Sequence, residues 1–375
     1  MNIGFDAKRI VRNTTGLGSY GRTLVRGLAY LPDSLRLRLY APDAGRDDLR
    51  RQVEGLPRVS LCYPKNTFLP FDKALWRDHG IVKDLKRDRV QLFHGLSGEL
   101  PRGIRKSGIR SVVTIHDLIF LRHPEFYSFV DARIYAWKFR RTLREADHVI
   151  AISECTRRDV LELGQIDPSH VSVVYQSCAP RFTSKPSPDE QEKTRLNYGL
   201  PRRFILSVGT IERRKNILLA VRALESLPSD LALVIVGRHT SYTNQVLEYV
   251  MTHGLSHRVF ILHDVPDADL PALYAQAEVF VYPSVYEGFG IPIIEAISCG
   301  LPVVGCTGSC LEEAGGPDNL YVSPDDPEAL AAAVRQLQRN APGREERIRR
   351  SRDYIRRFEG NDVATQVLDI YHSLL

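Results

Sequence analysis

Two glutamates separated by seven residues, Glu287 and Glu295, have the spacing and the surroundings of a ligand site. Glu287 falls in a glycine-rich turn, and Glu295 falls one turn into the helix that this turn is expected to open. Carboxylates accept hydrogen bonds from sugar hydroxyls, and the N-terminus of a helix attracts phosphate. The segment therefore predicts a site for a ligand that carries both hydroxyls and phosphate, such as a nucleotide-sugar.

The turn between the two glutamates permits close approach of a ligand. Gly288 and Gly290 have no side chain to obstruct it, and Pro292 suits the first turn of a helix, where its missing N–H is not needed. For an isolated pair, the ordinary interpretation would be one solvated loop glutamate and one glutamate that complements the helix dipole. The apolar strand predicted before the turn, residues 279–282, and the helix after it favour the binding interpretation.

A cluster of cations follows another predicted strand, residues 204–208. The loop begins at Gly209 and ends in Arg213, Arg214 and Lys215, directly before a predicted helix. Cationic side chains at such a position can neutralise a diphosphate that gains charge as it leaves. The alternative is a solvated basic turn with no part in binding.

Two further candidates lie in the first half of the chain. Gly16 and Gly18 belong to a formal Gly-x-Gly-x-x-Gly run, but nine residues separate this run from the strand that ends at Asp6. A dinucleotide-binding fold would place the first glycine in a tight turn next to that strand, so the spacing speaks against it. His116 ends another predicted strand and can donate or accept a hydrogen bond near a sugar, with a purely structural histidine as the alternative.

Apolar, strand-like runs alternate with amphipathic stretches along the chain, which predicts parallel βαβ units and an α/β fold with doubly wound sheets. The predicted strands are residues 3–6, 35–40, 91–94, 111–116, 148–153, 204–208, 232–236, 258–262, 279–282 and 302–305. The predicted helices are residues 18–31, 129–146, 154–163, 217–227, 244–253, 270–277, 292–299 and 343–357. Prolines at residues 179–188 interrupt the pattern, so we expect two domains, 1–182 and 183–357, followed by a C-terminal helix, 358–375.

Charge is distributed unevenly over the 375 residues. The net charge of +6 divides into +10 for residues 1–180 and −4 for residues 181–375. The basic half is expected to face a phosphorylated acceptor, a membrane surface or nucleic acid, and a generic arginine-rich surface is an equal alternative. No apolar run reaches the ~18 residues that span a bilayer and no secretory signal is visible, so we expect a cytoplasmic protein whose six cysteines are reduced.

The signature around the glutamate pair resembles that of the family 4 retaining glycosyltransferases. It reads Tyr-Pro-Ser-Val-Tyr-Glu-Gly-Phe-Gly-Ile-Pro-Ile-Ile-Glu-Ala at residues 282–296 and Cys-Gly-Leu-Pro-Val-Val at residues 299–304. The resemblance implies the GT-B fold, in which two Rossmann-like domains face each other across a cleft and a C-terminal helix returns to the first domain. It implies that residues 1–182 form the acceptor side and that residues 183–357 bind the nucleotide-sugar donor. It also implies that no cofactor and no metal is needed, so Asp267 and Asp269 are expected to begin a helix and not to bind Mg²⁺.

The resemblance gives the cationic loop a catalytic role. Lys215, helped by an arginine, would stabilise the departing diphosphate. Many members of the family carry that arginine directly after the loop glycine, where this chain has Thr210. Arg214 or Arg213 must then supply the second cation, and we expect Arg214.

The resemblance also assigns the residues around the donor. Glu287 and His116 would hold the sugar that is transferred, and Glu295 would bind the ribose hydroxyls. The backbone of the glycine loops would lie against the sugar and the diphosphate. The donor-binding residues expected from these loops are Gly16, Gly18, Gly209, Gly288, Phe289 and Gly290.

We therefore expect a retaining hexosyltransferase that uses a GDP- or UDP-linked sugar. The loop at residues 209–216 resembles that of bacterial surface-polysaccharide mannosyltransferases, which favours GDP-mannose, while UDP-glucose, UDP-N-acetylglucosamine and deoxyhexose donors stay open. The expected acceptor is a saccharide, a polyprenyl-diphosphate-linked saccharide or a lipopolysaccharide intermediate. We also expect peripheral contact with the anionic inner face of the membrane, with a core-packed Trp137 and ordinary surface arginines as the alternative. The residues expected at the membrane are Trp76, Trp137, Lys138, Phe139, Arg140 and Arg141.

Two other functions remain open at this point. A nucleotide-sugar epimerase of the same fold would share the diphosphate and sugar contacts, but it would need dedicated acid and base carboxylates beside the sugar. A non-catalytic protein could bind an anionic polymer through the basic half, but it would have no use for the glutamate motif. Nucleic acid is therefore not expected as a partner.

Overall fold

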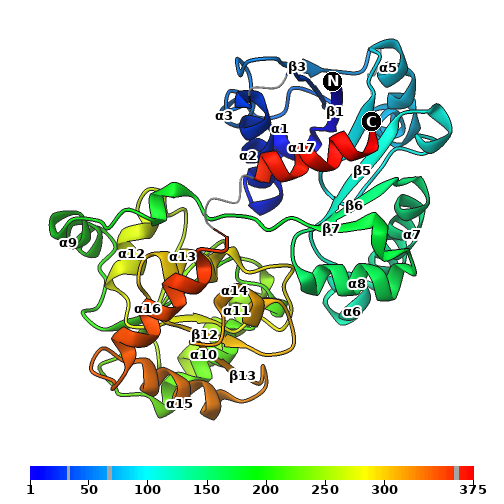
Figure 1. The fold of residues 1–375 in the computed structure, drawn as a ribbon. Coiled ribbons are helices and arrows are strands. Elements are labelled where there is room, and N and C mark those ends of the chain that lie inside the picture. The colour runs from blue at the N-terminus through cyan, green and yellow to red at the C-terminus, as the bar shows by residue number, and fades with distance from the viewer. Residues whose placement is uncertain (32–33, 66–69, 359–362) are drawn as a thin grey trace. The chain divides into compact units, whose positions relative to one another are not determined.

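The computed structural model describes residues 1–31, 34–65, 70–358 and 363–375. The chain divides into two compact units, Met1–Gln176 with Asn361–Leu375, and Ser177–Gly360. Each unit contains one parallel sheet with helices packed on it (Figure 1). The two doubly wound α/β sheets predicted from the sequence are confirmed, and the roles of the two units as acceptor side and donor side remain predictions.

Seven parallel strands form the sheet of the first unit: β1 (Asn2–Asp6), β2 (Arg36–Tyr40), β3 (Val59–Cys62), β4 (Leu92–Gly95), β5 (Arg110–Ile115), β6 (His148–Ala151) and β7 (Val171–Val173). Their order is β3-β2-β1-β4-β5-β6-β7. The chain adds strands toward one edge from β1 to β3 and toward the other edge from β4 to β7, so the order switches between β1 and β4. The helices of this unit are α1 (Lys8–Arg12), α2 (Gly16–Tyr30), α3 (Asp47–Arg50), α4 (Pro70–Leu75), α5 (Ile81–Arg87), α6 (Ile119–Arg122), α7 (Phe129–Glu145), α8 (Glu154–Gly164) and α17 (Val363–Leu374).

Six parallel strands form the sheet of the second unit: β8 (Phe204–Val208), β9 (Ala232–Val236), β10 (Val259–Leu262), β11 (Phe280–Tyr282), β12 (Val303–Cys306) and β13 (Leu320–Val322). Their order is β10-β9-β8-β11-β12-β13, with the corresponding switch between β8 and β11. The helices are α9 (Pro188–Asn197), α10 (Ile217–Ala223), α11 (Ser241–Thr252), α12 (Leu270–Gln276), α13 (Ile291–Ser298), α14 (Leu311–Gly315), α15 (Pro327–Leu337) and α16 (Arg344–Ile355).

Both faces of the central strands are buried. On one face of the first sheet, Ile3 and Phe5 of β1 belong to a core cluster with Leu24 of α2. On the other face, Phe93 of β4 belongs to a second cluster with Leu85 of α5. A strand that is covered on both sides is mostly apolar along its whole length, which is why these strands are readable as nearly continuous apolar runs.

The sequence pattern missed three strands, β3, β7 and β13, and each of them is the last strand at an edge of its sheet. Most of their residues are only half-buried, so they lack the apolar run that marks a central strand. It also missed the short helices α1, α3, α4, α5, α6 and α14 and two longer helices, α9 and α15. The one buried residue of α9 is Thr194, and a helix on the surface has little apolar periodicity. The helix predicted for residues 217–227 ends at Ala223 and continues as a 3₁₀ turn, Leu224–Ser226.

The C-terminal helix α17 is part of the core of the first unit, where it packs beside α2 (Figure 1). A Cβ atom on Gly27 of α2 would lie 2.7 Å from the Cβ of Ala364, so the glycine allows the two helices to touch. Further along α17, the Tyr371 hydroxyl lies 2.5 Å from Nδ1 of the fully buried His94. Burial lowers the pKa of His94 to about 3, so the ring is neutral and the tyrosine is its polar partner.

The Tyr371→Phe variant is expected to unfold more easily than the wild type. It keeps the ring but leaves Nδ1 of His94 without its partner in a dry core, which costs about 1–3 kcal/mol in the free energy of unfolding. Urea denaturation followed by tryptophan fluorescence measures this, because both tryptophans, Trp76 and Trp137, belong to the first unit. The control is Tyr30→Phe at a residue that is 68% exposed, and equal effects in the two variants would contradict the structural role.

Candidate active site

The loops that follow β8 and β11 leave the second sheet from neighbouring strands. The two strands are parallel and paired, with Leu206 opposite Phe280, so both loops emerge at the carboxyl edge of the sheet. The strand order reverses between them, and doubly wound sheets bind their ligands at such a point. The first loop carries the predicted cations and the second carries Glu287, so the topology brings the two predicted motifs together.

Glu287 is held between the two cations of the neighbouring loop. Its carboxylate oxygens lie 2.5 Å from Nζ of Lys215 and 2.9 Å from a guanidinium nitrogen of Arg214. The residue is buried, with 8% of its surface exposed. Burial alone would raise the pKa of Glu287, but the charges of Lys215 and Arg214 outweigh it and lower the pKa to about 2. Glu287 is therefore ionised at any physiological pH.

Tyr282 is the second hydrogen-bond partner of Lys215. The sequence analysis did not identify it as a candidate site residue. The lysine donates a hydrogen bond of 2.6 Å to the Tyr282 hydroxyl, and its ammonium lies 4.8 Å from the centre of the same ring. Burial lowers the pKa of Lys215, while Glu287 acts in the opposite direction. The position of Tyr282 as the last residue of β11 was the available signal, since side chains at strand ends reach the ligand edge.

The backbone of the first loop decides which arginine reaches the site. Arg213, Arg214 and Lys215 form a single 3₁₀ turn, and Asn216 then adopts a left-handed conformation with φ of 52° before α10 begins. Arg214 turns inward to Glu287 and also contacts the more exposed Glu212, whereas Arg213 is exposed. Gly209, at the start of the loop, has a φ of 151°, which favours glycine.

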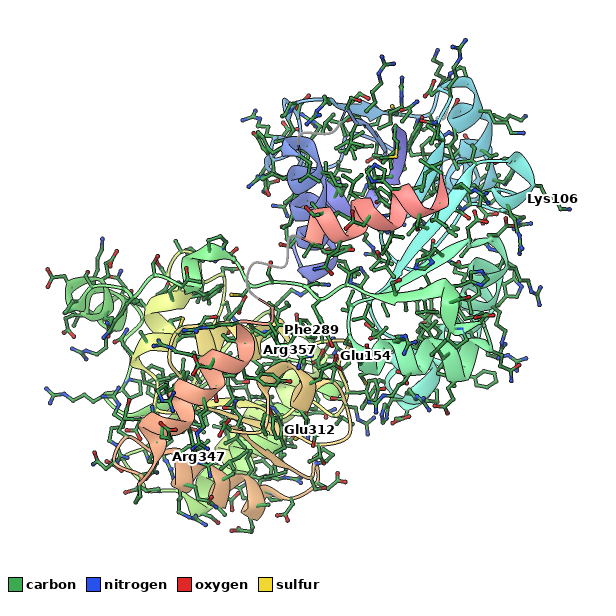
Figure 2. All side chains as sticks on the ribbon, viewed as in Figure 1. Lys106, Glu154, Phe289, Glu312, Arg347 and Arg357 are labelled. Carbon is green, nitrogen blue, oxygen red and sulfur yellow. The ribbon has the colours of Figure 1, made fainter. Side chains whose placement is uncertain are left out.

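The glycine-rich loop after β11 is anchored by packing. The Phe289 side chain is buried against Phe358, with ring centres 5.2 Å apart, near Arg357 (Figure 2). The Cys310 thiol lies 2.8 Å from the carbonyl oxygen of Phe289 and 3.1 Å from that of Glu287. Gly290 has a φ of 111° and ends the loop directly before α13. Because the Phe289 ring serves the core, only its backbone is available to a ligand.

Glu295 has a different environment from Glu287. It lies on α13 and accepts a hydrogen bond of 3.0 Å from the Tyr274 hydroxyl. Burial raises the pKa of Glu295 to about 7, and the hydrogen bond from Tyr274 only partly offsets this rise. No hydrogen bond or ion pair between described residues joins Glu295 to Lys215 or Arg214. The two glutamates are therefore distinct groups, one always charged and one that titrates near neutral pH.

His116 follows β5 in the first unit and lines a cavity of about 250 Å³. Its Nε2 donates a hydrogen bond of 2.9 Å to the carbonyl oxygen of Leu96, and the Tyr20 ring packs edge-on against it at 4.9 Å. Burial lowers the pKa of His116 to about 4, so the ring is neutral and Nδ1 can act as an acceptor. The same cavity is lined by Arg9, Ser97, Asp117, Tyr127, Tyr135 and Lys138.

The two glycines at the start of α2 have different surroundings. A Cβ atom on Gly18 would lie 2.0 Å from the carbonyl oxygen of Asn13, so this glycine is needed for the chain to pack against itself. A Cβ atom on Gly16 would meet nothing within 4 Å. Of the two glycines, Gly16 is therefore the one with open space beside its Cα atom, where a ligand could approach.

The acidic pair before α12 is engaged in other contacts. Asp267 lies 2.8 Å from a guanidinium nitrogen of Arg181, and Asp269 accepts a hydrogen bond of 2.6 Å from the Tyr198 hydroxyl. Asp269 directly precedes α12, as expected. Within the described ranges, no group of three or more His, Cys, Asp and Glu side chains could hold a metal ion.

Two of the residues expected at a membrane lie in the core instead. Trp76 is 8% exposed and donates a hydrogen bond of 2.7 Å to Asp84, and Phe139 is 3% exposed. Trp137, by contrast, is 54% exposed, so it is not a core residue. Phe139 lies on the inner face of α7, which the order of residues alone did not distinguish from the face that carries Trp137.

Known proteins match both halves of the chain. A family model described as Glycosyltransferase Family 4 matches residues 14–177, and one described as Glycosyl transferases group 1 matches residues 189–354. The O-antigen chain mannosyltransferase B of Escherichia coli is 28% identical over 100% of both chains. The alpha-maltose-1-phosphate synthase of Mycolicibacterium smegmatis is 30% identical over 75% of this chain and 77% of its own.

A solved structure agrees with the fold. The crystal structure of Anabaena Alr3699/HepE in complex with UDP and glucose aligns over 100% of both chains with a TM-score of 0.76 and 19% identity. At 19% identity, this similarity supports the fold alone. The family is supported by the sequence relatives and the family models. The chain therefore belongs to the family 4 glycosyltransferases, which are retaining hexosyltransferases with the GT-B fold, as the signature around Glu287 and Glu295 predicted.

Proposed function

We propose that this enzyme transfers mannose from GDP-mannose to a saccharide acceptor in the synthesis of a bacterial surface polysaccharide. The observation that carries the proposal is the cluster of Glu287, Lys215 and Arg214, which offers cations to a diphosphate and a carboxylate to sugar hydroxyls in one place. The choice of mannose is supported by the sequence of the loop at residues 209–216 and by the full-length similarity to an O-antigen chain mannosyltransferase.

Donor binding would exchange the partners of the cluster. Without a ligand, Lys215 and Arg214 both neutralise Glu287. The donor diphosphate would take over the two cations, because it carries more negative charge than one carboxylate. Glu287 would then accept hydrogen bonds from hydroxyls of the sugar, with Glu295 on the ribose and His116 as a further contact of the sugar.

The reaction would proceed on one face of the sugar. The bond from the anomeric carbon to the diphosphate oxygen breaks, and the bond to the acceptor hydroxyl forms on the same side, which retains the configuration. The departing phosphate oxygen takes the proton of the acceptor, so no nucleophile from the protein is needed. Lys215 and Arg214 would stabilise the charge that develops on the diphosphate, and Tyr282 would hold Lys215 in place.

The outer face of α7 would rest on an anionic membrane. Phe129, Val130 and Ile134 are 74%, 63% and 45% exposed, and exposed arginines lie beside them. Such a mixture of exposed apolar and cationic side chains suits the surface of a bilayer. In the described part of the chain, no helix is both long enough and apolar enough to cross one. The enzyme would then act at the cytoplasmic side of the membrane, where lipid-linked acceptors are found.

A thermal-shift screen of GDP-, UDP- and dTDP-sugars tests the choice of donor. GDP-mannose is expected to stabilise the protein most, by about 2.7 kcal/mol when present at 100 times its dissociation constant. Stabilisation by a UDP-sugar alone would exclude mannose transfer from GDP-mannose.

The donor should also be incubated without acceptor, since release of an isomerised nucleotide-sugar would identify an epimerase. The transfer rate is expected to be insensitive to EDTA.

Separate replacement of Arg214 and Arg213 by alanine tests which of the two arginines belongs to the active site. Arg214→Ala removes one of the cations beside Glu287 and is expected to lower kcat about 100-fold, which corresponds to roughly 2.7 kcal/mol. Arg213→Ala is the matched control and should retain wild-type activity, because Arg213 is exposed. Steady-state kinetics at saturating donor measures both. If the control loses as much activity as Arg214→Ala, the assignment of the second cation is wrong.

Donor affinity is expected to rise with pH through the titration of Glu295. Its pKa of about 7 means that the carboxyl is mostly protonated at pH 6 and ionised at pH 8, and the ionised form is the better acceptor for ribose hydroxyls. Binding to the ionised form alone would make the dissociation constant of the nucleotide-sugar about tenfold larger at pH 6 than at pH 8. Calorimetric titration should show this slope in the wild type and none in Glu295→Gln. A slope that survives in Glu295→Gln would assign the titration to another group.

A further inference from the structure

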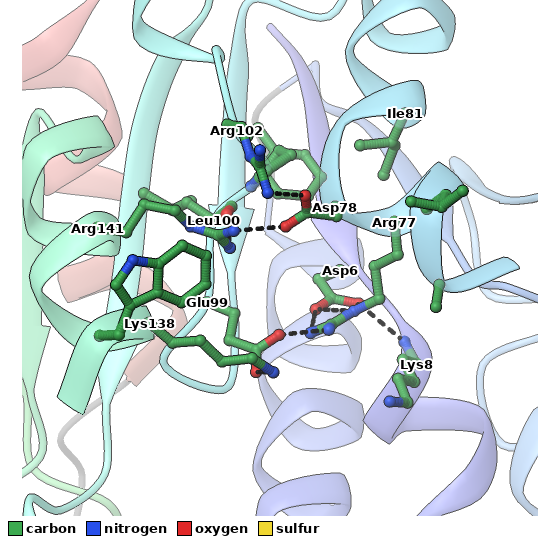
Figure 3. Close-up of a pocket in the computed structure, with 15 residues that line it drawn as sticks. Asp6, Lys8, Arg77, Asp78, Ile81, Glu99, Leu100, Arg102, Lys138 and Arg141 are labelled. Atoms are coloured by element: carbon green, nitrogen blue, oxygen red, sulfur yellow. Dashed lines mark hydrogen bonds and ion pairs between the residues drawn. The ribbon is translucent and has the colours of Figure 1, made fainter. Parts of the chain in front are cut away.

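A second cavity in the first unit has no part in the site described so far. It has a volume of about 330 Å³ and lies between the end of β1, the segment after α4 and the outer part of α7 (Figure 3). Glu99 and Lys138 line both this cavity and the one that contains His116, so the two cavities share a wall. Its volume falls within the ~300–1,000 Å³ of cavities that bind small molecules.

The wall of the cavity carries more cations than carboxylates. Arg77 bridges Asp6 and Glu99, as Figure 3 shows, and Lys138 lies 3.0 Å from the second oxygen of Glu99. Asp78 is contacted by two further arginines, Arg102 at 2.8 Å and Arg141 at 2.5 Å. Four cations are thus compensated by three carboxylates.

Lys8 is the fifth cation and has no such partner. It is half-buried in the wall of the cavity, and no carboxylate of a described residue lies within ion-pair distance of its ammonium. Burial and the nearby Arg77 lower the pKa of Lys8, and the charges of Glu99 and Asp6 act in the opposite direction. A half-buried ammonium in a cavity of net positive charge favours an anion as the missing partner.

An exposed aromatic ring lies at the same cavity. Trp137 is 54% exposed, and the guanidinium of Arg141 lies 5.0 Å from the centre of its ring. This contact holds the indole at the cavity, where its open face offers an apolar surface for the C–H groups of a sugar ring. The cavity therefore combines an anion site with a platform for a sugar.

We propose that this cavity binds a phosphorylated saccharide, with its phosphate at Lys8 and its sugar ring against Trp137. The inference deepens the proposed function and rests on it, because it names the acceptor as a saccharide that carries phosphate. The shared wall of Glu99 and Lys138 places this phosphate next to the His116 cavity, so an acceptor bound here would direct a hydroxyl toward that cavity.

Calorimetric titration of the full chain with α-mannose 1-phosphate tests the site. GDP is kept saturating so that the cations beside Glu287 are occupied. Mannose 1-phosphate is expected to bind about tenfold more tightly than either mannose or inorganic phosphate, and Lys8→Ala should weaken it about tenfold. Lys8→Arg keeps the charge and should retain binding, which separates loss of charge from loss of fold. Lys106→Ala, at an exposed lysine that points away from the first unit (Figure 2), is the matched control and should bind like the wild type.

The outcomes distinguish this site from the donor site. Binding of GDP is measured first in each variant, so a wild type that fails to bind GDP contradicts the proposed donor and leaves the Lys8 titration readable. Equal affinity of Lys8→Ala and the wild type for mannose 1-phosphate would overturn the proposal, and so would equal affinity for inorganic phosphate and mannose 1-phosphate. Phosphatidylglycerol vesicles form a last arm. Lys8-dependent binding to these vesicles without binding of mannose 1-phosphate would assign the site to a lipid headgroup and overturn the saccharide.

Discussion

The ionised carboxylate of Glu287, buried within the loop that follows β11, is the constraint on which the candidate active site depends. A buried charge is tolerated only where opposite charges and hydrogen-bond donors surround it. Lys215 and Arg214 meet this demand, and the loop that carries them must lie over β11 to do so. The positive φ angles of Gly209 and Asn216 let the loop reach that place. The geometry of the loop thus follows from the need to compensate one carboxylate.

The same electrostatic rule explains why the two glutamates of one motif behave differently. Glu287 has two cations and a low pKa, while Glu295 has one tyrosine hydroxyl and a raised pKa. A group that stays charged suits contact with a sugar whose leaving group gains charge. A group that titrates near neutrality makes affinity depend on pH. In the first unit, Arg77 is compensated by Asp6 and Glu99. Lys8, in the wall of the same cavity, has no carboxylate partner among the described residues.

Much of the fold was readable from the sequence because burial on both faces leaves a continuous apolar run. The central strands β1, β5, β8 and β9 were predicted to within one or two residues. The edge strands β3, β7 and β13 were not, since a strand with one open side need not have such a run, although the edge strand β10 does have one and was predicted. The turn before α13 was predicted from its glycines. Gly290 adopts a positive φ that few other residues tolerate, so this backbone conformation is visible in the sequence.

The sequence by itself determined which residue types are available for chemistry: a carboxylate pair in a strand–turn–helix setting, a basic loop after another strand, and a histidine at a strand end. Only the tertiary structure decided how they combine. It selected Arg214 over Arg213, added Tyr282 and Tyr274 as partners, and placed Trp76 in the core while Trp137 is exposed. The reason is physical: local pattern reports the burial and backbone preference of a segment, whereas hydrogen bonds and ion pairs between distant segments arise only when the sheet brings them together.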